Sequence, residues 1–200
     1  MAKKGRRRQD HLARKAQYDG YRARSVYKLV ALDEKFNLFP RRADHAGETV
    51  MRVLDLGAAP GSWTQYAVKN GAQVVAVDLQ EMRVAGADCR QADFTDPEVV
   101  AALSSDGPFD LVLSDAAPAT TGNKIVDTSR SEGLVEAIVA NLPTWLIPGG
   151  KCAFKLFQGG GEQALLAALR ERCDRAVLYR PKAVRSESFE TYLVGVGFRG

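Results

Sequence analysis

The stretch from Val53 to Tyr66, VLDLGAAPGSWTQY, constrains the fold more than any other part of the chain. An apolar strand gives way to a run of small residues, Gly57 to Gly61, and the chain then restarts as a helix. Small residues let the backbone turn tightly and come close to a ligand. In open α/β sheets, ligands bind beyond the carboxyl ends of the strands, where the turn after the first strand forms the floor of the site. The stretch therefore predicts an α/β protein with a cofactor site at this turn.

The rest of the chain alternates between strand-like and helix-like stretches, as in βαβ units. A helix with Ser25 as its cap is expected over residues 25–36, ahead of the first strand. Strands are expected over 52–56, 73–78, 86–90, 109–114, 150–156, 176–179 and 192–197, and helices over 62–70, 97–104, 129–146 and 162–172. Helical crossovers make neighbouring strands parallel. The last two strands have no helix between them, so an antiparallel pair is expected at that edge.

Positive charge is concentrated at the start of the chain. Residues 1–42 contain 13 lysines and arginines against 4 aspartates and glutamates, whereas the remaining 158 residues contain 15 against 20. Residues 1–20 have too few apolar positions to pack, and we expect them to be a flexible basic arm on a single domain of residues 21–200. A cationic arm suits a polyanion, because each neutralised phosphate releases counterions. The alternative is a solvated tail without a partner.

No apolar run approaches the ~18 residues of a membrane span, and the basic start lacks the apolar stretch of a signal peptide. The three cysteines, Cys89, Cys152 and Cys173, are far apart and have no neighbouring histidine, so no metal site is expected. These features predict a cytoplasmic protein that contacts no membrane and needs no metal.

The glycines at the first turn do not spell a dinucleotide site. The pattern G-x-G-x-x-G would need glycine at position 59, which is Ala59, and no G-K-[ST] phosphate loop follows. An acidic residue, Asp78, ends the next strand about 20 residues on, where it can accept hydrogen bonds from ribose hydroxyls. Asp93 ends the third strand, within reach of an adenine amino group. A nucleoside cofactor without a pyrophosphate fits this set better than NAD.

The segment DLGAAPGSW, followed by an acidic strand end, resembles motif I of class I S-adenosylmethionine-dependent methyltransferases, and its AAPGxW form resembles the FtsJ-like ribose 2′-O-methyltransferases. The resemblance implies a Rossmann-like fold, a seven-stranded, mostly parallel sheet with helices on both faces and an antiparallel last strand. It also implies contacts with S-adenosylmethionine at Gly57, Gly61, Trp63, Asp78, Asp93 and Asp115. Ser62 stands where the family often has a second glycine and is tolerable as a helix cap. Trp63 could instead be a core aromatic, and Asp78 and Asp93 solvated strand-end carboxylates.

Four further residues match the K-D-K-E tetrad of the FtsJ-like family in order and in local context: Lys28, Asp115, Lys155 and Glu190. Taken singly, each has an ordinary explanation as a solvated side chain or a structural ion pair. The match implies methyl transfer to a ribose 2′-hydroxyl of RNA, with Lys155 as the proton acceptor. A lysine accepts a proton only when it is neutral. Lys28 nearby would favour that form and the two carboxylates would oppose it, so the sequence leaves the balance open.

The resemblance implies RNA as the partner, with a uridine of large-subunit ribosomal RNA as the expected target, either in free RNA or within the large ribosomal subunit. The enzyme is expected to act as a monomer. Transfer RNA is an alternative substrate. A non-catalytic RNA-binding ribosome-assembly factor is a second alternative, and an NAD-dependent reductase is disfavoured by the failed glycine pattern. Candidate backbone contacts are Arg22, Arg24, Lys28, Arg180, Lys182 and Arg185, with Tyr27 or Phe189 stacking on a base. Gly159–Gly161 could bind a phosphate or form an ordinary turn.

Overall fold

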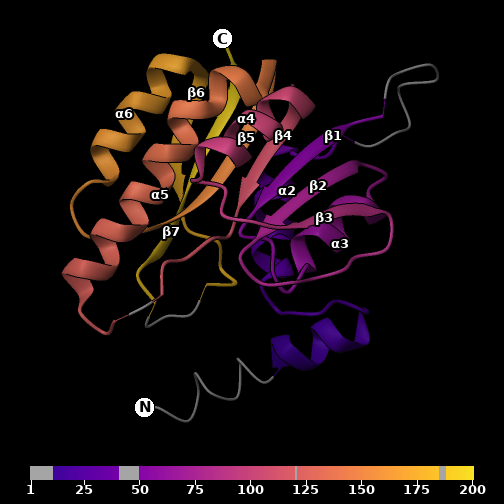
Figure 1. Ribbon diagram of the computed structural model, residues 1–200. Helices are drawn as coiled ribbons and strands as arrows, with labels where there is room; N and C mark the ends of the chain where they lie inside the picture. Colours follow the sequence, from indigo (N-terminus) through magenta and orange to yellow (C-terminus); the bar gives the residue numbers. More distant parts are fainter. Residues whose placement is uncertain (1–10, 41–49, 120, 185–187) are drawn as a thin grey trace.

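The computed structural model describes residues 11–40, 50–119, 121–184 and 188–200. Its centre is a seven-stranded sheet in the order β3-β2-β1-β4-β5-β7-β6 (Figure 1). The strands are β1 (Arg52–Leu56), β2 (Gln73–Asp78), β3 (Ala87–Gln91), β4 (Phe109–Ser114), β5 (Leu146–Phe157), β6 (Cys173–Tyr179) and β7 (Glu190–Phe198). The helices are α2 (Val26–Phe36), α3 (Ser62–Lys69), α4 (Pro97–Asp106), α5 (Lys124–Trp145) and α6 (Glu162–Arg172). No helix among these described ranges is long and apolar enough to cross a bilayer.

The strand pairing confirms the predicted α/β sheet. Strands β1 to β5 pair in parallel, and β7 pairs antiparallel with both β5 and β6. The last strand is thus inserted between its two partners, and β6 forms the edge. This insertion brings the start of β7 next to the carboxyl end of β5, where Lys155 pairs with Tyr192.

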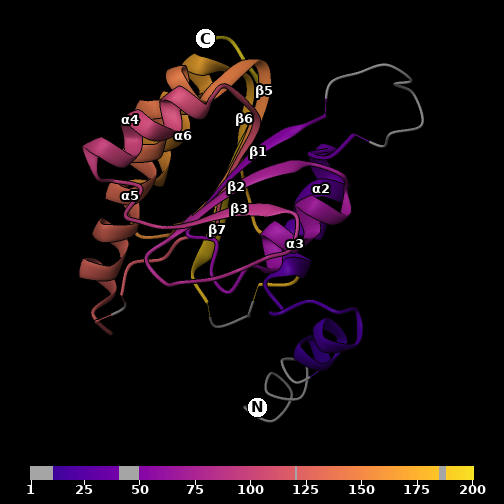
Figure 2. The same ribbon diagram turned by 45° about the vertical axis from the view of Figure 1, so that its right-hand side comes forward.

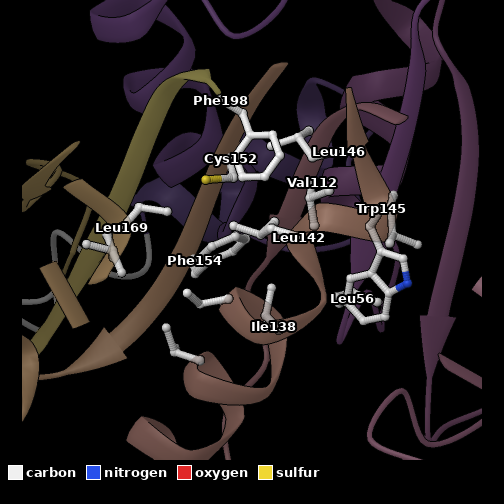
Figure 3. Packing of buried hydrophobic residues seen from close by; sticks show 14 of the residues in the cluster. Leu56, Val112, Ile138, Leu142, Trp145, Leu146, Cys152, Phe154, Leu169 and Phe198 are labelled. Atoms are coloured by element: carbon white, nitrogen blue, oxygen red, sulfur yellow. The ribbon is translucent and has the colours of Figure 1, made fainter. Parts of the chain in front are cut away.

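Helices cover both faces of the sheet: α4, α5 and α6 lie on one side, and α2 and α3 on the other (Figure 2). Each face has its own core because alternate side chains of a strand point to opposite faces. On β4, Val112 belongs to the core under α5, whereas Leu111 and Leu113 belong to the core under α2 and α3. Figure 3 shows the first of these cores, in which Leu142 of α5 and Phe154 of β5 are fully buried.

Helix α2 forms where the spacing of apolar residues predicted it, but Ser25 does not cap it through its side chain as expected. Val26, Leu29 and Leu32 are fully buried, at the spacing of one helical face. The helix ends at Asn37, which has a left-handed φ of 50°. The predicted cap, Ser25, makes no capping hydrogen bond. Its hydroxyl lies 2.8 Å from the hydroxyl of Ser62 instead.

Helix α5 begins five residues earlier than predicted. Its true cap is Asn123, whose side-chain oxygen accepts the N–H groups of Ile125 and Val126. Ile125 is 81% exposed, so this first turn has no apolar face that periodicity could detect.

The proposed flexible arm is helical in its second half. Residues 11–18 are in a helix, and Ala16 is buried. The end of this helix is tied to α2, because the Tyr27 hydroxyl donates to Asp19 Oδ2 at 2.8 Å and Lys15 pairs with the same carboxylate. These contacts involve only one apolar side chain, that of Ala16, and otherwise the polar groups of Lys15, Asp19 and Tyr27. A count of apolar residues therefore could not detect them. Residues 1–10 lie outside the described residues.

Candidate active site

A cleft of about 440 Å³ opens at the carboxyl ends of β1, β2 and β4. This volume is within the range of roughly 300–1,000 Å³ that is usual for small-molecule sites. Four residues predicted to bind the cofactor line the cleft: Gly57, Asp78, Asp93 and Asp115. Leu79, Phe94 and Pro118 add apolar surface. The convergence follows from the parallel strands, whose carboxyl ends meet at one edge.

The turn after β1 requires glycine. Gly57 has φ +68°, and a Cβ added there would lie 2.4 Å from Cβ and 2.6 Å from Cα of Ala116, which forms the opposite wall. Gly61 has φ +101° and precedes α3; its added Cβ would lie 2.6 Å from Val84. Gly57 therefore lets the ends of β1 and β4 come together and keeps the floor of the cleft free of side chains, whereas Gly61 lets the turn pack closely against Val84.

Backbone groups fix the acidic residues of the cleft. Asp78 accepts the Ala59 N–H at 2.9 Å and the Gln80 N–H at 2.8 Å, one at each carboxylate oxygen. A carboxylate offers about four acceptor positions, so two remain for ribose hydroxyls. Asp93 accepts both the N–H and the hydroxyl of Thr95 at Oδ1, and these bonds hold its pKa below the ordinary value. These donors and acceptors fit a nucleoside cofactor.

Trp63 and Gly61 do not line the cleft, and their contact with the cofactor stays a prediction. Trp63 is 2% exposed and donates its indole N–H to the Ser25 carbonyl at 3.0 Å. Ser62 is buried in the first turn of α3 and does not cap it, since its hydroxyl contacts Ser25. The two side chains therefore fasten the segment before α2 to the cofactor turn.

The four tetrad side chains come together beside the cleft. Lys155 Nζ lies 3.3 Å from Asp115 Oδ1 and also donates to the Asp115 carbonyl. Lys28 Nζ lies 2.7 Å from Glu190 Oε2 and 3.7 Å from Asp115 Oδ1. Both lysines are only 8% exposed, and a buried ammonium needs such partners. Asp115 joins the two halves of the site because it lines the cofactor cleft and contacts both lysines.

Tyr192 is a member of this cluster that the sequence analysis missed. Its side chain is fully buried, and its hydroxyl donates to Asp115 Oδ1 at 2.8 Å. Burial and the neighbouring Asp115 carboxylate raise the pKa of Tyr192, so the phenol stays protonated and remains a donor. A signal for it existed: Tyr192 is two residues beyond Glu190, and strand residues at that spacing share a face.

A fully buried carboxyl group lies beneath the cofactor turn. Asp55 is completely buried in β1, and its Oδ2 accepts the Thr64 hydroxyl at 2.7 Å, while Oδ1 has no hydrogen-bond partner within the described part of the chain. Burial raises the pKa of Asp55 to about 7, although the Thr64 hydrogen bond opposes this rise. Within the described ranges, no group of three or more His, Cys, Asp and Glu side chains is arranged to hold a metal ion.

Three of the predicted RNA contacts are engaged within the protein. Arg22 donates to the carbonyl of Pro60 at 3.1 Å and to that of Arg83, and Arg180 donates to the carbonyl of Glu190 at 3.0 Å. Arg24 donates to the carbonyl of Ala183 at 3.5 Å. Each of these arginines therefore positions a segment next to the site.

Two further candidates make contacts within the protein, and one cannot be placed. The N–H groups of Gly159 and Gly160 donate to Glu162, and that of Gly161 donates to Glu132, which favours the ordinary turn over the phosphate site. Phe189 packs edge-on against Phe157, with ring centroids 4.8 Å apart. Arg185 lies outside the described residues.

Comparisons with known proteins identify the family of this chain. The family described as FtsJ-like methyltransferase matches residues 21–198. A relative from Treponema denticola, named ribosomal RNA large subunit methyltransferase E, is 44% identical over the whole of both chains, and its namesake from Maricaulis maris is 43% identical over 96% of this chain and 67% of its own.

Solved structures of methyltransferases share the fold of this chain. A putative ribosomal RNA methyltransferase from Plasmodium falciparum has a TM-score of 0.76 at 27% identity, covering 90% of this chain and all of its own. Human methyltransferase-like protein 13 in complex with SAH has a TM-score of 0.55 at 16% identity, covering 86% of this chain and 79% of its own, and supports the fold alone. The chain belongs to the FtsJ-like methyltransferase family, and S-adenosylmethionine is its cofactor.

Proposed function

We propose that this protein methylates a ribose 2′-hydroxyl of large-subunit ribosomal RNA. The observation that carries the proposal is the position of Asp115, which lines the cofactor cleft and whose Oδ1 also lies 3.3 Å from Lys155 Nζ. A proton acceptor thus lies at the edge of the cleft that holds the methyl donor. The names of the relatives supply the RNA class, since they are ribosomal RNA large subunit methyltransferases.

The residues of the tetrad have separable roles. S-adenosylmethionine, when bound, supplies a methyl group that is already activated for transfer. Lys155 in its neutral form accepts the proton of the 2′-hydroxyl as the oxygen–carbon bond forms and the carbon–sulfur bond breaks. Asp115 orients Lys155, and Tyr192 holds Asp115 through the 2.8 Å hydrogen bond. Lys28 and Glu190, joined at 2.7 Å, position the ribose.

The finer points of the substrate belong to the same proposal. We expect the target to be a uridine, presented by ribosomal RNA or by the assembled large subunit, and the enzyme to act as a cytoplasmic monomer. Transfer RNA remains the alternative substrate. A non-catalytic assembly factor would have no use for two buried lysines that meet at one carboxylate, so the tetrad geometry argues against it.

The test uses radioactive methyl transfer from S-adenosylmethionine to ribosomal RNA and to transfer RNA, followed by alkaline hydrolysis. A 2′-O-methyl group blocks cleavage of the next linkage, so label is expected in an alkali-resistant dinucleotide from ribosomal RNA. Replacing Lys155→Met should lower the rate by roughly 10²- to 10⁴-fold, the usual contribution of a general base, and leave S-adenosylhomocysteine binding intact.

The matched control is Lys151→Met, on the same strand, whose ammonium group contacts the Asn37 carbonyl away from the tetrad. It should retain activity. Wild-type activity in Lys155→Met would remove Lys155 from the mechanism, and label confined to transfer RNA or to a base would replace the proposed substrate.

A further inference from the structure

We infer that a second groove, beside the tetrad, binds an unpaired base of the same RNA next to the target nucleotide. The groove has a volume of about 570 Å³ and lies between the helical residues 11–18, α2 and the end of β6. The inference rests on the proposed function and adds a second contact with that substrate. Its walls combine two tyrosines, Tyr27 and Tyr179, with Lys35, Lys182 and Glu34.

The groove and the tetrad share two elements. Helix α2 presents Lys28 to the tetrad, and Tyr27, Ala31 and Lys35 line the groove. Residues 27, 31 and 35 are spaced by four and form one helical face. On the other wall, Tyr179 of β6 lies directly opposite Tyr192 of the neighbouring strand β7, the residue whose hydroxyl donates to Asp115. An RNA strand with its ribose at the tetrad can therefore continue over α2 into the groove.

The two tyrosines are held in place and remain partly exposed. The Tyr27 hydroxyl donates to Asp19 at 2.8 Å, and the Tyr179 ring packs edge-on against Phe36, with centroids 5.4 Å apart. Rings fixed in this way lose little conformational freedom when a base stacks on them, and stacking tolerates any base sequence. The groove therefore offers a preformed stacking surface.

The charges of the groove fit a nucleotide better than a simple anion. Lys35 and Lys182 are exposed and can contact phosphates on either side of a base. Glu34 would repel a phosphate, but its carboxylate can accept hydrogen bonds from the amino group of a base. An acidic peptide could use the lysines but has no ring to stack on the two tyrosines, so we assign the groove to RNA.

The experiment compares two fluorescent probes without methyl donor: a short single-stranded oligoadenylate and an abasic ribose-phosphate chain of the same length. Both carry the same phosphates, so their affinity ratio reports base stacking. Tyr27→Leu and Tyr179→Leu should each reduce this ratio by roughly 5- to 150-fold, the range for loss of one stacked base. Lys182→Glu should weaken both probes alike and reduce the salt dependence. Arg170→Glu changes an exposed residue of α6 on the opposite face of the sheet and should leave the affinity for both probes unchanged.

Ultraviolet cross-linking of the wild-type protein to a 4-thiouridine oligonucleotide gives a second readout that depends on no variant. Cross-links within 27–35 or 179–183 are expected. An unchanged affinity ratio in both tyrosine variants overturns the inference, as do cross-links found only outside these two segments. A competition with polyglutamate tests the acidic-peptide alternative: if polyglutamate displaces RNA from the wild-type protein but not from Lys182→Glu, the inference is also overturned. If wild type methylates RNA in these cases, the proposed function stands without the groove; if wild type methylates no RNA, the proposed function fails whatever the groove binds.

Discussion

Replacing Gly57→Ala should damage stability and cofactor binding together. The residue has φ +68°, and the left-handed region costs an alanine about 1–2 kcal/mol. Its new Cβ would also lie 2.6 Å from the Cα of Ala116, a backbone atom that cannot rotate away. Overpacking of this kind costs about 1–3 kcal/mol. The free energy of unfolding should therefore fall by about 2–5 kcal/mol, which lowers the Tm by roughly 4–20 °C.

The matched control is Gly149→Ala, because Gly149 has φ +82° but no atom within 4 Å of its added Cβ. Gly149→Ala has the conformational cost of a left-handed φ but no clash. The difference between the two variants in urea unfolding therefore gives the free-energy cost of the contact with Ala116 alone. Calorimetric titration with S-adenosylhomocysteine should show weakened binding only in Gly57→Ala, since Ala116 borders Asp115 in the cleft. Equal losses of stability in the two variants, or unchanged binding in Gly57→Ala, would refute the reasoning about the turn.

Three further predictions concern the buried acid, the tetrad and the first residues. Burial raises the pKa of Asp55 to about 7, above the ordinary value of 3.8 for an aspartate in the unfolded chain, so its contribution to stability is full below about pH 4 and is lost as pH rises toward 7. Asp55→Asn should remove this pH dependence of the unfolding free energy, measured by urea unfolding across that range, and an identical pH dependence in both proteins would contradict it. Tyr192→Phe loses a hydrogen bond to a carboxylate and should lower kcat by roughly 10- to 150-fold without altering S-adenosylhomocysteine affinity, whereas a change in affinity alone would argue against a positioning role. Deleting residues 1–10, which contain five lysines and arginines, should weaken RNA binding and make it less salt-dependent. The slope of log binding constant against log salt concentration should fall by about 0.7 for each lost phosphate contact, and an unchanged slope would mean that these residues contact no phosphate.

The local pattern around β1 was enough to predict the cofactor turn. A strand, small residues and a helix follow one another in sequence, and the acidic residues Asp78 and Asp93 mark the ends of the next two strands. Because parallel strands end at one edge, their convergence in the cleft followed without knowledge of distances. The tetrad could be assigned only by family resemblance, since Lys28 and Glu190 are 162 residues apart.

Contacts that depend on packing between distant segments were not predictable. The hydrogen bond from the Trp63 indole to the Ser25 carbonyl depends on where α2 crosses α3, and the contact between the Ser25 and Ser62 hydroxyls depends on the same crossing. Propensity favours serine as a cap, but a polar partner close by in space competes for the hydroxyl. Similarly, the place of Tyr192 follows from the insertion of β7 between β5 and β6, which no local pattern specifies.

The insertion of β7 also sets the order in which the enzyme can become active during synthesis. Strand β7 leaves the ribosome after the other six strands of the sheet, and it brings both Glu190 and Tyr192 to the site. Before it emerges, the cofactor turn and Lys155 are already in the chain, but β5 and β6 lack the strand that joins them. A nascent chain that stops short of residue 190 therefore has the cofactor turn but lacks Glu190 and Tyr192, the residues proposed to position the ribose and to hold Asp115.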